Sequence, residues 1–320
     1  DRAGDHGLRA GGARDQFATG TGTGDEGGSV YTYQPSAEDI LGQTPGSEPA
    51  DNVVKQTIFA TGAKVGITQK SYYLQDEWHI TDNFMARIGV RNDGFENTNS
   101  LGQTYVKQVH SWQPRLGFSW DVHGDSTLKI YGSAGDYSLP LDGNVALRGA
   151  SASLYESQYF SYTGVNPQTG APIGLGPLPA GYAAVNPARD QPSFQNGEAG
   201  VVPNPSAVAT RDLKPFKQRE FILGAQQQVA DWTLGVKGIY RKVLTGIDDS
   251  CDFRPIAQYA NAHYGMNIDT TSLTPPATNI PGCYIFNPGS QVTLNTPLDA
   301  SGKLYTVHLS GADIGEPKYK

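Results

Sequence analysis

Apolar and polar residues alternate with a period of two in several stretches of the chain. In the first stretch, Tyr72, Leu74, Trp78 and Ile80 alternate with Tyr73, Gln75, Glu77 and His79. The turn-like sequence Thr81-Asp82-Asn83 follows, and the alternation resumes over 84–91. Successive side chains of a β-strand point to opposite faces, so two alternating runs joined by a tight connection predict a β-hairpin.

The same pattern recurs further along the chain. Alternating runs occupy 112–122 and 127–137, and a third pair occupies 221–229 and 232–240. A last candidate strand starts near Lys303. No segment with a helical period competes with these runs, so the sequence predicts an all-β protein with about seven antiparallel strands.

The connections between the predicted strands are of two kinds. Three are tight turns, at 81–83, 123–126 and 230–231, and three are long loops, at 98–111, 139–212 and 248–302. The two kinds alternate along the chain. In an up-and-down sheet this places every tight turn on one rim and every long loop on the other, as in outer-membrane β-barrels with short periplasmic turns and long extracellular loops. We therefore expect part of an antiparallel transmembrane β-barrel.

All four tryptophans lie near the ends of predicted strands. Trp78, Trp120 and Trp232 are each within three residues of a tight turn, and Trp112 enters its strand from a long loop. Tryptophan favours membrane interfaces because its ring is amphipathic and its N–H needs a partner. We predict that these residues mark the two membrane interfaces. The alternative is a β-sandwich with tryptophans as core anchors.

The second face of the predicted strands is polar. In a barrel this face lines the lumen or contacts a plug, whereas in a sandwich it would meet water. The candidates for lumen-facing residues are Glu77, Arg87, Arg91, Asp93 and Arg115. The apolar face has one exception, Asp76, whose carboxylate would have to snorkel or lie near the rim, where a charge costs less than at the membrane midplane.

Residues 1–70 differ in composition from the rest of the chain. They are polar and rich in glycine, as in the stretch 19–28, and predict an irregular extracellular segment that leads into the first strand. Gly22, Gly24 and Gly27 fit G-x-G-x-x-G. The sequence around them does not provide the strand and helix that a dinucleotide site needs.

Composition excludes several classes of protein. The 320 residues include 39 glycines and 21 prolines, which argues against a helical bundle. The mean hydropathy is −0.43, and no apolar run approaches the roughly 18 residues of a membrane helix. Long polar loops dilute short one-faced strands, so this average is compatible with a membrane barrel. Lys+Arg 24 against Asp+Glu 31 gives a net charge of −7, with no basic run for nucleic acid.

The sequence gives no sign of enzymatic chemistry. The six histidines are scattered without metal-ligand spacing, and we find no G-x-S-x-G, H-E-x-x-H or Walker sequence. We predict no catalytic residue, no metal and no cofactor. Asp248, Asp249 and Asp252 could hold a cation, but a solvated acidic loop is the more common role for such a group.

Several motifs, in this order, resemble one known family. The segment 72–78, Tyr-Tyr-Leu-Gln-Asp-Glu-Trp, followed by 87–91, Arg-Ile-Gly-Val-Arg, is similar to a strand pair in the barrel of TonB-dependent outer-membrane receptors. The segment 114–120, Pro-Arg-Leu-Gly-Phe-Ser-Trp, resembles the strand that comes next there. Leu213-Lys214-Pro215 and the residues that follow resemble a later strand pair of the Oar-like subgroup. The resemblance covers roughly 70–320.

The resemblance implies a receptor in the outer membrane of a Gram-negative bacterium. Such a receptor binds an extracellular ligand, a peptide or protein in the Oar-like subgroup, and takes it up with energy from TonB, which acts through an N-terminal plug domain. We expect this chain to hold residues of the middle of the barrel, without the plug domain and the C-terminal strands. The alternatives are a passive porin-like channel, which needs no plug, and a secreted β-rich binding protein.

The long loops are the expected recognition surface. Tyrosine gives a large contact area at low entropic cost. The candidates for ligand binding are Tyr155, Tyr159, Tyr162, Tyr182, Tyr259, Tyr264 and Tyr284. Because the cell exterior is oxidising, we also predict that Cys251 and Cys283 form a disulfide within the second long loop.

Overall fold

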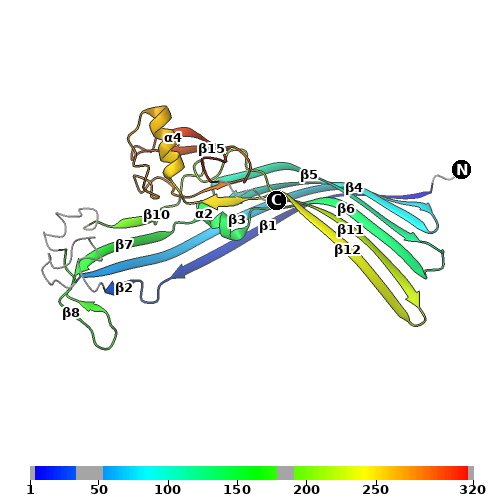
Figure 1. The fold of residues 1–320 in the computed structure, drawn as a ribbon, viewed down its shortest axis with the longest axis horizontal. Coiled ribbons are helices and arrows are strands. Elements are labelled where there is room, and N and C mark those ends of the chain that lie inside the picture. Colours follow the sequence, from blue (N-terminus) through cyan, green and yellow to red (C-terminus); the bar gives the residue numbers. More distant parts are fainter. Residues whose placement is uncertain (1–3, 34–52, 179–190, 316–320) are drawn as a thin grey trace.

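The computed structural model describes residues 4–33, 53–178 and 191–315. Its main feature is one long antiparallel sheet (Figure 1). The strands of this sheet are β1 (Asp5–Gly24), β2 (Val30–Tyr33), β3 (Val53–Thr81), β4 (Phe84–Thr98), β5 (Thr104–Asp121), β6 (Leu128–Leu139), β7 (Leu154–Ser161), β10 (Ser193–Ala199), β11 (Phe216–Val229) and β12 (Trp232–Thr245). Their order is β10-β7-β3-β4-β5-β6-β11-β12, and β1 and β2 also pair with β3.

The remaining elements are short. They are the helices α2 (Gly143–Ala150) and α4 (Arg254–Tyr264), and the strands β8 (Gly164–Val165), β9 (Pro172–Ile173), β13 (Asp248–Ser250), β14 (Tyr284–Phe286), β15 (Val292–Pro297) and β16 (Leu304–Leu309). In the part of the chain that the structure describes, neither helix is long and apolar enough to cross a membrane.

The predicted hairpins are present. β3 pairs with β4, β5 with β6, and β11 with β12, all antiparallel. Their three tight turns lie at one end of the sheet, on the right in Figure 1. The all-β prediction is confirmed, and the sheet of the described residues is open rather than closed. The described strands therefore form part of a barrel wall and not a closed barrel.

The two faces of the sheet differ as the alternation predicts. Leu74, Leu223 and Val236 lie on one face and are 54%, 61% and 74% exposed. Their neighbours on the other face include the charged pair Glu77 and Arg87, which the register places opposite each other. Exposed apolar side chains in a continuous band are unfavourable in water but suit contact with lipid.

The prediction of an irregular segment over residues 1–70 is wrong for three parts of it, β1, β2 and the start of β3, and residues 34–52 lie outside the described residues. β1 occupies 5–24 and pairs with β3 from Ala60 to His79, and β3 itself begins at Val53. The glycines of β1 explain why its pattern is so weak. A Cβ on Gly11 would meet the ring of Tyr73 at 2.7 Å, and one on Gly12 would meet the ring of Tyr72 at 3.1 Å. The glycines thus make room for tyrosine rings of the neighbouring strand.

The prediction of a long loop over 98–111 is also wrong. β4 continues to Thr98 and β5 starts at Thr104, so only a short turn separates them. Two irregularities in the register explain why the alternation was lost there. One falls between Asp93 and Phe95, where His110 has a φ of 62°, and the other falls next to Thr98. A bulge shifts the alternation by one residue and hides a strand from a period-two pattern.

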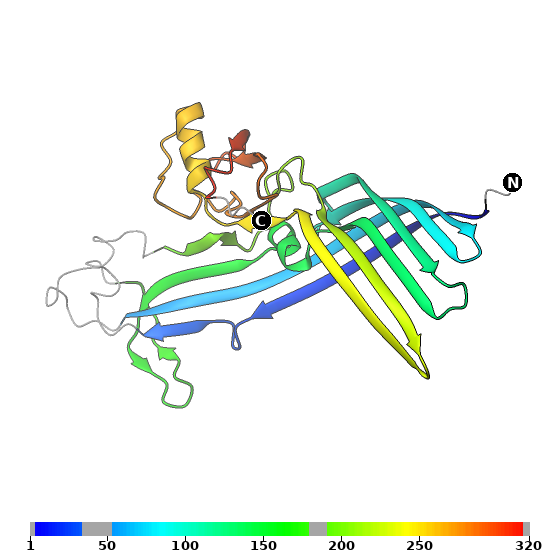
Figure 2. The ribbon, with the colours of Figure 1, turned by 45° about the vertical axis from the view of Figure 1, so that its right-hand side comes forward.

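The long loops 139–212 and 248–302 contain folded structure. We call α2, α4 and β13 to β16 together the cap; it covers one side of the sheet near the loop end (Figures 1 and 2). The last candidate strand, near Lys303, is β16. It pairs with β15 in a separate two-stranded sheet of the cap and does not extend the barrel wall, which corrects its predicted role.

The cap has an ordinary hydrophobic core. The side chains of Phe253, Ile256, Ile280, Leu294 and Val307 are at most 2% exposed and belong to one cluster. Helix α4 has a proline in its first turn and ends at Gly265, whose φ of 63° terminates the helix in the left-handed region. A second cluster, which includes Tyr105, packs α2 onto the sheet.

Candidate functional site

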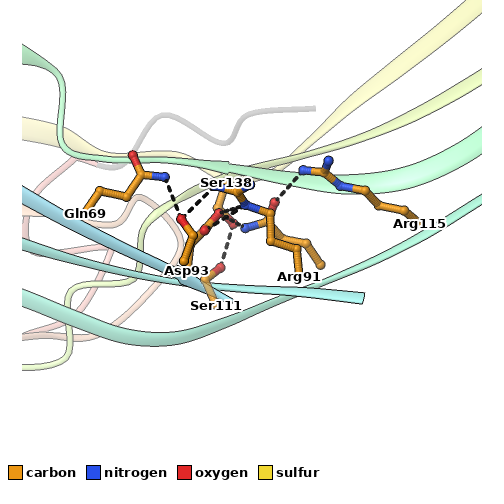
Figure 3. A network of polar contacts seen from close by, with 8 residues as sticks. Gln69, Arg91, Asp93, Ser111, Arg115 and Ser138 are labelled. Carbon is orange, nitrogen blue, oxygen red and sulfur yellow. Dashed lines mark hydrogen bonds and ion pairs between the residues drawn. The ribbon is translucent and has the colours of Figure 1, made fainter. Parts of the chain in front are cut away.

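A network of polar side chains lies on the inner face of β3, β4 and β5 (Figure 3). The Arg91 Nε donates to both carboxylate oxygens of Asp93, at 2.8 and 3.0 Å, and its Nη2 donates to Ser71 at 2.7 Å. Gln113 donates to Asp93 and accepts from Arg115. Asp93 is only 2% exposed, so its charge needs these partners to offset the loss of water.

Two further ion pairs lie on the same face. Glu77 binds Arg87 at 2.9 Å between β3 and β4, and Glu220 binds Arg241 between β11 and β12. The structure thus brings all five predicted lumen-facing residues to one polar surface. Their place in a barrel lumen stays a prediction. The surface itself is a stiff, charged wall that a polar domain could contact.

A cavity of about 350 Å³ lies beside the cap, between α2 and β10; we call it the arginine pocket. Arg148 supplies the positive charge of this pocket. The guanidinium of Arg148 is 3.5 Å from Glu198 and 3.3 Å from Asp249. The wall beyond includes Gly282 and Cys283, so the second long loop closes a pocket formed mainly by the first.

Burial and the neighbouring arginine act in opposite directions on the pKa of Glu198. Burial raises the pKa of the Glu198 carboxyl, while the positive charge of Arg148 works in the opposite direction. The pocket thus presents a carboxyl group and a half-exposed guanidinium side by side to a ligand. The pocket can therefore recognise groups of both charges, such as those of a peptide.

A second cavity, of about 690 Å³, lies further out along β7 and β10; we call it the rim pocket. Tyr159 and Phe194 line one side, and Pro275 and Pro276 line the other. Gly197 belongs to both pockets, which makes them neighbours. β10 is the end strand of the main sheet, so its outer edge faces this region rather than another strand of that sheet.

The other predicted ligand-binding tyrosines lie in different places. Tyr155 packs edge-on against Phe59, and Tyr162 against Tyr33. Tyr259 stacks on His263 in α4, with ring centroids 3.9 Å apart, and Tyr264 packs against Tyr305 of β16. Tyr182 lies outside the described residues. Only Tyr159 lines one of the two pockets, and its role in binding stays a prediction.

Tyr284 does not fit its predicted role. It is 1% exposed and lies in β14, inside the core of the cap. Burial also raises the pKa of its hydroxyl. The neighbouring residues Ile285 and Phe286 are buried as well, which makes this strand a structural centre of the cap.

The predicted disulfide between Cys251 and Cys283 is present. It joins the segment before α4 to the segment before β14. The acidic residues around Cys251 have protein partners: Asp249 lies beside Arg148, and Asp252 accepts hydrogen bonds from Arg254. Among the residues that the structure describes, no group of three potential ligands could hold a metal ion.

Three tryptophans lie at the turn end of the sheet, and the fourth, Trp112, lies in the middle of β5. Trp232 follows the β11–β12 turn directly and is 74% exposed, and Trp120 pairs with Phe84 beside the neighbouring turn. Trp112 was predicted to enter its strand from a long loop, but β5 begins eight residues earlier, at Thr104; the side chain of Trp112 is exposed. Their contact with a membrane interface stays a prediction. Trp78 stacks on His6 of β1.

The exception on the apolar face, Asp76, has a partner that the sequence did not suggest. The Nδ1 of His6 lies 2.8 Å from a carboxylate oxygen of Asp76. Sequence reasoning also missed Arg148 and Glu198. These two residues are 50 positions apart and belong to no motif, so only the fold brings them together.

An open antiparallel wall with an apolar outer face, a polar inner face and long loops on one rim defines an outer-membrane barrel. The sequence model of the family described as TonB dependent receptor-like, beta-barrel matches residues 4–261. The chain belongs to this family and is a protein of the outer membrane of Gram-negative bacteria, as predicted.

The chain is also similar to two individual proteins. The chain is 23% identical over 249 residues to the TonB-dependent transporter Oar of Myxococcus xanthus, covering 70% of this chain and 22% of that protein. It therefore spans about a fifth of the length of this relative. The structure is also similar to the alcaligin outer membrane receptor FauA of Bordetella pertussis, with 11% identity, a TM-score of 0.25, and coverage of 75% of this chain and 40% of that one.

Proposed function

We propose that this chain forms part of the barrel wall and extracellular cap of a receptor that binds a peptide or protein outside the cell and imports it with energy from TonB. The observation that carries the proposal is the pair of adjoining pockets at the loop end. They combine a charged arginine pocket with an aromatic and proline-lined rim pocket.

This combination suits a peptide better than a small apolar solute. A peptide presents charged groups, apolar side chains and a backbone that can pair with a strand edge. Arg148 and Glu198 would bind its charges, Tyr159 and Phe194 its apolar side chains, and the edge of β10 its backbone. The association of the Oar-like subgroup with such cargo points the same way.

Coupling to TonB requires a plug domain held inside the barrel. The inner polar network around Arg91 and Asp93 supports this part of the proposal, because paired and buried charges give a plug a rigid surface to contact. A passive channel would need an open lumen instead.

The test compares the proteins and peptides that cells remove from their medium. Wild-type cells, cells without this receptor and cells without TonB are grown in the same conditioned medium, and mass spectrometry measures what remains. We expect specific peptides or proteins to be depleted by wild-type cells alone. Depletion that persists without TonB would favour a passive channel and contradict the proposal.

The arginine pocket has a matched control in the cap. Arg148→Gln should reduce depletion of the cargo by about tenfold, the usual cost of losing one charged contact. Arg254→Gln removes the same charge from an exposed arginine that lines neither pocket. It should leave depletion unchanged. Equal effects of the two substitutions would mean that the pocket does not bind the cargo.

A further inference from the structure

A groove crosses the outer, apolar face of the sheet over β5, β6, β11 and β12. It has a volume of about 580 Å³ and an almost wholly apolar lining. The ring of Phe118 lies over Gly132, where an added Cβ would meet it at 2.6 Å. The small residues Ala134 and Gly238 form the floor, and the larger side chains of Leu116 and Leu223 belong to the same lining. We call it the outer groove.

The groove opens outward rather than into the lumen. On the inner face, Gly117 and Ser133 are flanked by Arg115, Tyr131 and Glu220, according to the register of the strands. None of these three flanking side chains belongs to the lining. The lining contains two complete rows of the outer face, Leu116–Ala134–Phe221–Tyr240 and Phe118–Gly132–Leu223–Gly238, and one row of the inner face that lies between them, Gly117–Ser133–Ile222–Ile239. The outer groove therefore faces the hydrocarbon part of the membrane.

Three cations lie on the same face just above the groove: Lys217, Arg219 and Lys242, which we call the outer cation cluster. Arg219 is two residues from Phe221 of the groove and pairs in register with Lys242 of β12. Lys217 lies two residues further along β11. Alternation along a strand puts all of these side chains on one face.

One carboxylate fixes two of these cations. Asp136, which is nearly buried, lies 2.7 Å from the Nε of Arg219 and 3.4 Å from the Nζ of Lys217. Arg219 is nonetheless 46% exposed, and Asp136 accepts hydrogen bonds only from the Nε and Nη2 of its five-donor guanidinium. Three positive charges against one negative charge leave the site cationic.

The level of the cluster matches the outer edge of the membrane. From Arg219 to Val229, beside the opposite turn, ten residues of a tilted strand cover about 24 Å, close to the apolar band of roughly 25 Å in such barrels. Trp112 lies near the same level, and its carbonyl oxygen accepts a hydrogen bond from Lys217. Cations at this level meet lipid head groups, and the groove below them meets acyl chains.

We propose that the outer groove and the outer cation cluster form a binding site for a phosphorylated acyl lipid of the outer leaflet. One acyl chain lies in the groove over Ala134 and Gly238, and a phosphate binds Arg219, Lys217 and Lys242. Guanidinium and ammonium groups suit phosphate, and Asp136 holds the guanidinium in place for it.

The test uses the intact receptor in detergent and native mass spectrometry with purified lipid A. Wild-type receptor should retain bisphosphorylated lipid A and bind its phosphate-free analogue much more weakly. The variant Lys217→Gln/Arg219→Gln/Lys242→Gln should raise the dissociation constant for lipid A on the order of a hundredfold, at about 1 kcal/mol per cation. Lys237→Gln, on the inner face of β12, is the matched control and should bind as the wild type does.

A second variant probes the groove without changing the charge. A Cβ on Gly238 has no atom within 4 Å, so Gly238→Leu can fill the groove without a clash. It should weaken lipid A binding about tenfold and leave the receptor folded, as judged by heat-modifiable mobility on gels. Equal binding of lipid A and its phosphate-free analogue, an unchanged triple variant, or an unchanged Gly238→Leu would overturn the proposal.

Discussion

The sheet and the cap of this protein place apolar side chains in opposite ways. On the outer face of β11 and β12, Leu223 and Val236 are more than half exposed. In the cap, Leu294 and Ile256 are at most 2% exposed. The polar groups are reversed too, since Asp93 on the sheet is buried and the cap carries its charged pair Asp252–Arg254 at the surface.

The difference reflects two surroundings acting on one chain. The cap folds against water and gains stability by removing apolar surface from it. The sheet meets lipid on its outer face, where an apolar side chain already has a suitable neighbour and gains little from burial. Each of the following predictions is designed to break or sharpen this contrast, from the largest expected effect to the smallest.

Removing the disulfide should destabilise the cap most. Cys251→Ser/Cys283→Ser releases a loop whose ends are 32 residues apart, and the lost restraint on the unfolded chain amounts to about 3 to 4 kcal/mol. Hydrogen–deuterium exchange should show faster exchange in α4 and β14, while β4 and β5 stay protected. Wild-type receptor treated with reductant should give the same pattern; increased exchange across the sheet would mean that the cap and sheet unfold together.

A cavity in the core of the cap should reduce its stability nearly as much as loss of the disulfide does. Leu294→Ala removes a fully buried side chain and should lower the stability of the cap by about 3 kcal/mol. Leu234→Ala makes the same chemical change on the outer face of the sheet, where Leu234 is 58% exposed, and should cost less than about 1 kcal/mol. Thermal unfolding of both variants measures the difference, and equal losses would contradict the assignment of the outer face to lipid.

A charge on the outer face should be unfavourable only there. Leu223→Arg places a cation in the apolar band and should lower the stability of the membrane-inserted barrel by about 2 kcal/mol. Gln226→Arg, three residues along on the inner face of the same strand, is the control and should cost little. Refolding yields into lipid vesicles report both. If Gln226→Arg were the more harmful of the two, the inner and outer faces would have to be exchanged.

The smallest effect concerns the surface charges of the cap. Hydrogen bonds from Arg254 hold the pKa of Asp252 below its ordinary value of 3.8. The ion pair therefore stabilises the folded cap above about pH 4 and is lost as the pH falls through the lower, folded-state value. At pH 6, Asp252→Asn should lower the free energy of unfolding by a few tenths of a kcal/mol, which a slightly lower unfolding temperature reports. Near pH 2 the variant should match the wild type. A stability difference between variant and wild type that grew as the pH fell would contradict this prediction.

The sequence predicted the strands that alternate regularly and missed those that do not. The run from Tyr72 to Ile80 is visible because lipid and polar faces impose a strict period of two. β1 lacks that period because its glycines accommodate the rings of Tyr72 and Tyr73, and the start of β5 lost it at a bulge. Neither feature can be seen without the neighbouring strand.

The sequence predicted the general nature and location of the candidate site but not the residues that form its pocket. A loop-end location, the polar inner residues and the cysteine pair could all be named from the sequence, and the structure joins Cys251 to Cys283. The arginine pocket could not be predicted, because Arg148 meets Glu198 and Asp249 only after three separate segments of the chain have folded together.

The sequence by itself determined the class of fold, the two faces of the strands and the end at which the tight turns lie, because local alternation is a direct record of what each face contacts. The tertiary structure decided which loops fold into a cap, which tyrosines remain accessible and which partner neutralises Asp76. Those outcomes depend on contacts between residues far apart in the chain, as His6 and Asp76 are, and such contacts leave no period in the sequence.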